Sequence, residues 1–132
     1  MRRIAFRIAA ALATAAALAA AGCETETTTL GNVIAECLTG TSCACGTGNC
    51  VYDCPGGGCV LTCTGASNCV FSCGGVGHCS FECDNVGNCN ATCAGGGCAM
   101  TCTGTGNGVL SSCPSGCTAT SVGGTGSCLL VN

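Results

Sequence analysis

Cysteine is the residue type with the most chemistry to offer in this sequence. The 132 residues include 19 cysteines, against one histidine, three basic and six acidic residues. Thiols at this density either pair as disulfides or bind metal ions as thiolates. Which of the two applies depends on the spacing of the cysteines and on the compartment in which the chain folds.

The N-terminus predicts export. Three arginines are followed by an apolar run from Ile8 to Ala21, built almost entirely of Ala, Leu and Ile. This order is typical of a signal peptide, which we assign to residues 1–22. The run is shorter than the roughly 20 residues that span a bilayer, and no second run follows, so we expect a mature chain without a transmembrane helix.

The predicted cleavage region, Ala20-Ala21-Gly22-Cys23, resembles the lipobox of bacterial lipoproteins, in which the cysteine is cleaved at its N-terminal side and lipidated. The resemblance implies a lipid anchor at Cys23, a membrane partner and a place in the cell envelope. Glu24 is not the Asp that retains enterobacterial lipoproteins in the inner membrane, which favours the outer membrane. The alternative is ordinary cleavage after an Ala-x-Ala site, which gives a secreted or periplasmic protein.

Assigning Cys23 to lipid leaves an even number of cysteines, all of which can pair in an oxidising compartment. A metallothionein-like metal-binding protein is the alternative, but only Cys43 and Cys45 have the tight spacing of that class. We predict no metal and no cofactor. The expected disulfide cysteines are Cys37, Cys43, Cys45, Cys50, Cys54, Cys59, Cys63, Cys69, Cys73, Cys79, Cys83, Cys89, Cys93, Cys98, Cys102, Cys113, Cys117 and Cys128.

Charge excludes two classes of partner. All three basic residues lie in the signal peptide, so the mature chain carries only acidic groups besides His78. Nucleic acids and anionic lipid headgroups are bound by clustered cations. We therefore expect no nucleic-acid partner, and we expect the membrane to be reached through the lipid alone.

Repeated units position the cysteines. Six units of the form Cys-x-apolar-x-Cys recur every nine or ten residues, separated by Gly-, Asn- and Ser-rich connectors, and less regular copies begin at Asn32, Asn107 and Ser127. Alternation over five residues predicts a strand with both cysteines and the central residue on one face. The predicted inward column is Tyr52, Leu61, Phe71, Phe81, Ala91, Met100 and Leu110.

These units predict an all-β fold. We expect a disulfide-stapled β-solenoid of nine- to ten-residue repeats over residues 31–132, with a meander of short hairpins as the alternative. Residues 23–30 are polar and without periodicity, which predicts a lipid-anchored tether. Within an extended unit the two cysteines lie roughly 13 Å apart, whereas a disulfide needs Cα atoms within about 7 Å, so every bridge should join different units.

The position before the second cysteine is outward-facing and rich in hydroxyl groups, which predicts a surface file. The Thr62-Cys63-Thr64 and Thr101-Cys102-Thr103 triplets resemble the Thr-Cys-Thr motif of insect antifreeze proteins, which are disulfide-rich β-helices. That resemblance implies an ice-binding surface, although Asp53 and Glu82 interrupt the file. Its hydroxyl members are Thr62, Ser72, Thr92, Thr101 and Ser111.

No residue set predicts catalysis. His78 occupies the corner position that Asn49, Asn68 and Asn88 hold in other units, where we expect it to serve a turn with positive φ. Glu82 and Asp84 share the outward face of one unit but are not repeated in the others. We therefore predict a non-enzymatic, envelope-anchored structural or binding module, with an ice- or carbohydrate-binding surface and a metal-binding protein as the alternatives.

Overall fold

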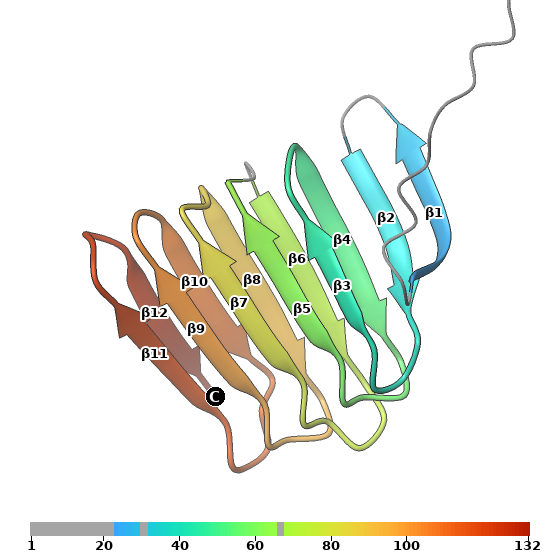
Figure 1. Ribbon diagram of the computed structural model, residues 1–132. Helices are drawn as coiled ribbons and strands as arrows, with labels where there is room; N and C mark the ends of the chain where they lie inside the picture. The colour runs from blue at the N-terminus through green and yellow to red at the C-terminus, as the bar shows by residue number, and fades with distance from the viewer. Residues whose placement is uncertain (1–22, 30–31, 66–67) are drawn as a thin grey trace, which may run out of the picture.

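Figure 1 shows an all-β molecule whose short strands stack into two facing sheets. The computed structural model describes residues 23–29, 32–65 and 68–132, so the predicted signal peptide lies outside the described residues. In that part of the chain no helix is long and apolar enough to cross a bilayer.

The strands divide between a seven-stranded sheet, here called sheet A, and a five-stranded sheet, called sheet B. In spatial order, sheet A contains β1 (Cys23–Thr29), β2 (Asn32–Cys37), β4 (Asn49–Cys54), β6 (Asn68–Cys73), β8 (Asn88–Cys93), β10 (Asn107–Ser111) and β12 (Ser127–Val131). Sheet B contains β11 (Thr118–Val122), β9 (Ala99–Thr103), β7 (Ser80–Asp84), β5 (Val60–Thr64) and β3 (Ser42–Cys45).

The predicted solenoid is confirmed, with about five turns. From β2 onward every strand pair is parallel, and each strand pairs with the strand two further along the chain, whereas a hairpin meander would give antiparallel neighbours. Each coil therefore contains two of the predicted units, one in each sheet. The nine- to ten-residue period of the sequence is half of the structural repeat.

The segment predicted as a tether is a strand instead. β1 pairs antiparallel with β2 along the outer edge of sheet A, with Cys23 opposite Cys37 and an irregularity between Glu24 and Thr27. The backbone of β1 pairs with an edge of sheet A that would otherwise be open. A lipid on Cys23 would therefore attach to the first residue of an edge strand.

The predicted inward column forms the core. All seven of its members are buried, and the central residues of sheets A and B meet in the narrow interior. The rings of Tyr52 and Phe71, in neighbouring coils of sheet A, stack with a centroid separation of 6.3 Å, and Phe71 stacks with Phe81 of sheet B at 5.7 Å. The aromatic contacts therefore run both along the solenoid and across its interior. The Tyr52 hydroxyl donates a hydrogen bond of 2.9 Å to the Ala44 carbonyl, which ties sheet A to sheet B.

An asparagine ladder runs along the start of the sheet A strands. Asn49, Asn68 and Asn88 each donate a side-chain hydrogen bond of 2.9 Å to the asparagine of the preceding coil, the first acceptor being Asn32. The five asparagines from Asn32 to Asn107 share one register position and are 17 to 20 residues apart. Identical amides stacked at the strand spacing fix the register of successive coils.

Candidate functional site

Disulfides are the dominant chemical feature of the solenoid. All 18 cysteines from Cys37 to Cys128 are paired, and no bridge joins the two cysteines of one extended unit, so the predicted connectivity rule is confirmed. Seven bridges join the end of one strand to the beginning of the next. They are Cys37–Cys43, Cys45–Cys50, Cys54–Cys59, Cys63–Cys69, Cys73–Cys79, Cys83–Cys89 and Cys93–Cys98.

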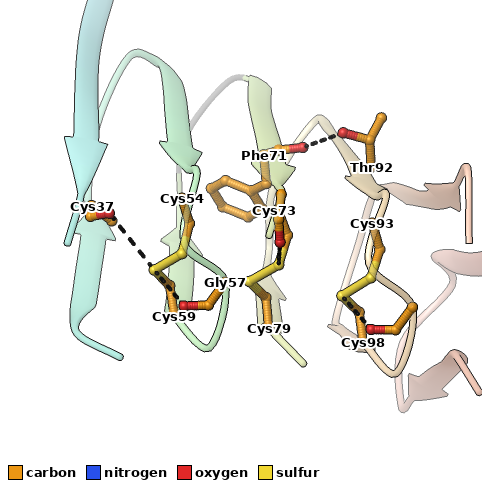
Figure 2. Close-up of a disulfide and its surroundings, with 12 residues drawn as sticks. Cys37, Cys54, Gly57, Cys59, Phe71, Cys73, Cys79, Thr92, Cys93 and Cys98 are labelled. Carbon is orange, nitrogen blue, oxygen red and sulfur yellow. Dashed lines mark hydrogen bonds between the residues drawn. A yellow bond between two sulfur atoms is a disulfide. The ribbon is translucent and has the colours of Figure 1, made fainter. Parts of the chain in front are cut away.

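The bridges form two columns, one at each corner of the coil. Figure 2 shows Cys54–Cys59, Cys73–Cys79 and Cys93–Cys98 aligned at the corner where sheet A leads into sheet B. Their Cα atoms are 6.3 Å apart, because the reversal of the chain brings the ends of consecutive strands together. Cys113–Cys117 closes the corresponding corner after β10. A disulfide at each corner restricts the conformation of the glycine-rich backbone, which would otherwise be the most flexible part of the coil.

One bridge departs from this pattern. Gly108 stands in β10 where the other units have their first cysteine, and Cys102, which would have bonded there, bonds Cys128 of the next coil, 26 residues away. A Cβ on Gly108 would lie 2.2 Å from the Cys102 Sγ, so only glycine leaves room for this bridge. Because Gly108 replaces the first cysteine of its unit, a long-range disulfide can form that joins the last coil to the array.

Three cysteine trios have sulfur atoms within 4.8 Å of one another, but every member is disulfide-bonded. The metal-binding form of a cysteine is the thiolate, which a disulfide sulfur is not. The trios arise because successive bridges stack along a column. They are Cys45 with Cys63 and Cys69, Cys73 with Cys79 and Cys98, and Cys93 with Cys98 and Cys117.

The predicted hydroxyl file is not a single file. Thr62 and Thr101 lie on sheet B, whereas Ser72, Thr92 and Ser111 lie on sheet A, because consecutive units belong to opposite sheets. The expectation of one file was wrong for that reason. On sheet A the Thr92 and Ser111 hydroxyls donate hydrogen bonds of 3.5 and 3.3 Å to carbonyls of the preceding coil, so they also serve the stack.

The outer face of sheet B carries the threonine pairs and the two carboxylates. Glu82 and Asp84 in β7 lie between Thr62 and Thr64 of β5 on one side and the threonine pair of β9 on the other. These side chains line a shallow depression that is open to solvent. The arrangement offers hydroxyl and carboxylate oxygens on one surface, but the carboxylates divide the hydroxyl array.

Sequence reasoning missed an apolar stripe on the outer face of sheet A. Ile34, Val51, Val70 and Leu129 occupy one register position and are exposed, with Asn90 and Val109 at the same position in β8 and β10. The signal was present in the sequence. The residue after the first cysteine position is a large apolar residue in every second unit except the one that contains Asn90.

His78 has the role expected of it, with φ of 59° at the corner before β7. Its structural equivalents are Gly58 and Gly97, which also have positive φ, and not the asparagines, which lie in strands of sheet A. The Gly97 Cα faces the imidazole, since a Cβ there would lie 2.5 Å from the His78 Nδ1. Because Gly58, His78 and Gly97 all have positive φ, this corner position needs a residue that tolerates left-handed backbone.

Comparison with known proteins adds no functional assignment. No family model matches the sequence, and neither a curated protein nor a solved structure matches the chain. The resemblance to insect antifreeze proteins rests on two triplets, which lie in β5 and β9 and are separated by Glu82 and Asp84 of β7.

Proposed function

We propose that the mature chain is a non-enzymatic structural module of the cell envelope, a short rigid rod anchored through lipid at Cys23. The observation that carries this proposal is the double column of corner disulfides. The corner bridges join the ends of consecutive strands and one bridge ties the last coil to the array, so together they oppose local opening of the coils. A stiff, protease-resistant spacer or scaffold is the use that such a construction favours.

The disulfides also support an exported location. Nine bridges in a chain of this size are typical of proteins that fold in an oxidising compartment. The outer membrane is the finer part of the proposal and rests on the lipobox-like residues and on Glu24. Because β1 begins at Cys23, the lipid would hold the first coil close to the membrane with the solenoid axis in a restricted orientation.

The geometry favours this proposal over the two alternatives. An ice- or carbohydrate-binding face needs a continuous array of matched groups, and the hydroxyl residues are split between two faces and divided by carboxylates. A metal-binding protein needs free thiolates, and the cysteines from Cys37 to Cys128 are in disulfides. A scaffold needs only the rigid stack that the bridges hold.

Replacing the lipid acceptor tests the anchor. We expect Cys23→Ala either to move the protein from the membrane fraction to the soluble fraction or to block its processing, because the thioether link to lipid can no longer form. Gly22→Ala is the matched control, since it keeps a small residue at the neighbouring position and should leave the distribution unchanged. Unchanged membrane association and processing of Cys23→Ala would contradict the anchor.

Intact mass of the envelope-extracted protein tests the lipid and the disulfides together. We expect the mass to exceed that of the chain from Cys23 onward by the acyl and glyceryl groups, and alkylation without reduction to add nothing. Alkylation after reduction should add 18 groups, one for each cysteine from Cys37 to Cys128. A substantial number of alkylated thiols before reduction would favour the metal-binding alternative instead.

A further inference from the structure

The two ends of the solenoid differ. At the first coil, β1 covers the edge of sheet A, and the inward residues Ala35 and Cys43 are buried. At the last coil, β11 and β12 end their sheets with no strand partner on the outer side among the described residues. Leu130 occupies the inward position there and is 40% exposed, whereas its neighbour Leu110 is fully buried.

The open edges lack the features that usually prevent strand edges from pairing. Natural edge strands carry charged side chains, proline or a bulge. β11 and β12 contain no charged residue and no proline, and their pairing with β9 and β10 is regular over all five residues. Leu129, Leu130 and Val131 of β12 are all at least 40% exposed. The last coil therefore has two unpaired strand edges, and the one formed by β12 carries exposed apolar side chains.

Two copies that meet at this end bring no charged side chains together. No Asp, Glu, Lys, Arg or His occurs from residue 85 to residue 132, whereas Glu36, Asp53, Glu82 and Asp84 lie in the earlier coils. Contact between two first coils would bring acidic groups together. Contact between two last coils leaves the carboxylates on the remote halves of both copies, where ionic screening weakens their interaction.

We propose that the last coil is a self-association surface, through which two copies of the chain pair end to end about a two-fold axis. Such an axis sets β12 antiparallel to β12 of the second copy, and β11 antiparallel to its counterpart. Leu129 is the central residue of β12, so a register centred there places it opposite its own counterpart on the outer face. Leu130 then lies opposite Cys128 on the inward face, and the exposed end of the core becomes covered.

The contact is small, because it consists of two strand pairs of five residues each. Interfaces below the standard size give weak or transient association. We therefore expect a dimer whose population rises with protein concentration. Each sheet of the dimer continues across the junction, so the stack lengthens from about 30 Å to about 60 Å at roughly 4.8 Å per strand.

A pair of matched lysine substitutions tests the proposal in a Cys23→Ala background, where lipid cannot drive association. Leu129→Lys and Val70→Lys change the same outward register position of sheet A, on strands β12 and β6. Leu129→Lys places two ammonium groups opposite each other at the junction and should raise the dimer dissociation constant at least about tenfold. Val70→Lys should leave it unchanged, and unaltered circular dichroism shows that both variants are folded.

Sedimentation velocity over a concentration series measures the association, and small-angle scattering measures its shape. End-to-end pairing predicts that the longest dimension roughly doubles, while the cross-section stays that of the monomer. A dimer that Val70→Lys disrupts and Leu129→Lys does not would place the contact on the apolar stripe of sheet A and overturn the proposal. A parent protein that stays monomeric up to millimolar concentration would overturn it as well.

Discussion

Removing the long-range bridge between Cys102 and Cys128 should destabilise the protein more than removing a corner bridge. We compare the double variant Cys102→Ala/Cys128→Ala with Cys73→Ala/Cys79→Ala, so that neither protein carries an unpaired thiol. The sequence separations are 26 and 6 residues. Cross-linking restricts the unfolded chain more when the closed loop is longer. The loop-entropy relation gives about 3.5 kcal/mol for the long bridge and about 2.2 kcal/mol for the corner bridge at 25 °C.

The burial of the four cysteines predicts the opposite order of destabilisation, so the comparison distinguishes between the two explanations. Cys73 and Cys79 are at most 2% exposed, whereas Cys102 is 7% exposed and Cys128 is only partly buried. If lost packing dominated, truncation at the corner would create the larger cavity and cost more. The loop model therefore predicts a difference of about 1.3 kcal/mol in one direction, and the cavity model predicts a difference in the other.

Denaturant unfolding under non-reducing conditions, followed by circular dichroism, measures the two free energies of unfolding. Native-state hydrogen exchange then locates the effect, and we expect amides of β11 and β12 to lose protection in the long-bridge variant while those of β6 keep it. A corner variant that is equally or more destabilised would refute the loop-entropy reasoning. Unchanged exchange in β11 and β12 would show that the bridge does not hold the last coil.

Two further predictions concern the bridges as a set and the packing of the corners. Complete reduction should unfold the solenoid and abolish its β-type circular dichroism. The reason is that the combined stabilisation by nine bridges, at about 2 to 4 kcal/mol each, exceeds the roughly 5 to 15 kcal/mol stability of a typical domain. A retained spectrum would show that the thin core is sufficient to hold the fold. Gly77→Ala should lower the free energy of unfolding by at least about 2 kcal/mol more than Gly40→Ala. Both glycines have φ near +70°, but a Cβ on Gly77 would lie 2.0 Å from the Gly96 carbonyl oxygen, whereas a Cβ on Gly40 meets nothing within 4 Å. Equal losses in thermal or denaturant unfolding would show that backbone conformation, and not the close stacking of corners, sets the cost.

The sequence alone determined the properties that depend on neighbours along the chain. Strict alternation in Cys-x-apolar-x-Cys fixes which residues share a face, so the inward column from Tyr52 to Leu110 was predicted correctly. The rise of an extended strand fixes the distance within a unit, so bonding between Cys69 and Cys73 was correctly excluded. A positive φ at His78 was also predicted correctly, although it was inferred from an equivalence with asparagines that lie in strands. Each of these results needs only local geometry.

Only the tertiary structure decided which strands lie side by side. Alternation assigns the faces of one strand but carries no information about its partner, and parallel pairing joins residues a whole coil apart. For that reason Thr62 and Ser72 were predicted to lie in one file, whereas they belong to two sheets. Residues 23–30 were predicted to be a tether, because an edge strand of Thr and Glu is recognisable only beside the sheet that it covers. The bridge from Cys102 to Cys128 depends in the same way on stacking, since the stack brings these two cysteines together and Gly108 leaves room for their sulfur atoms.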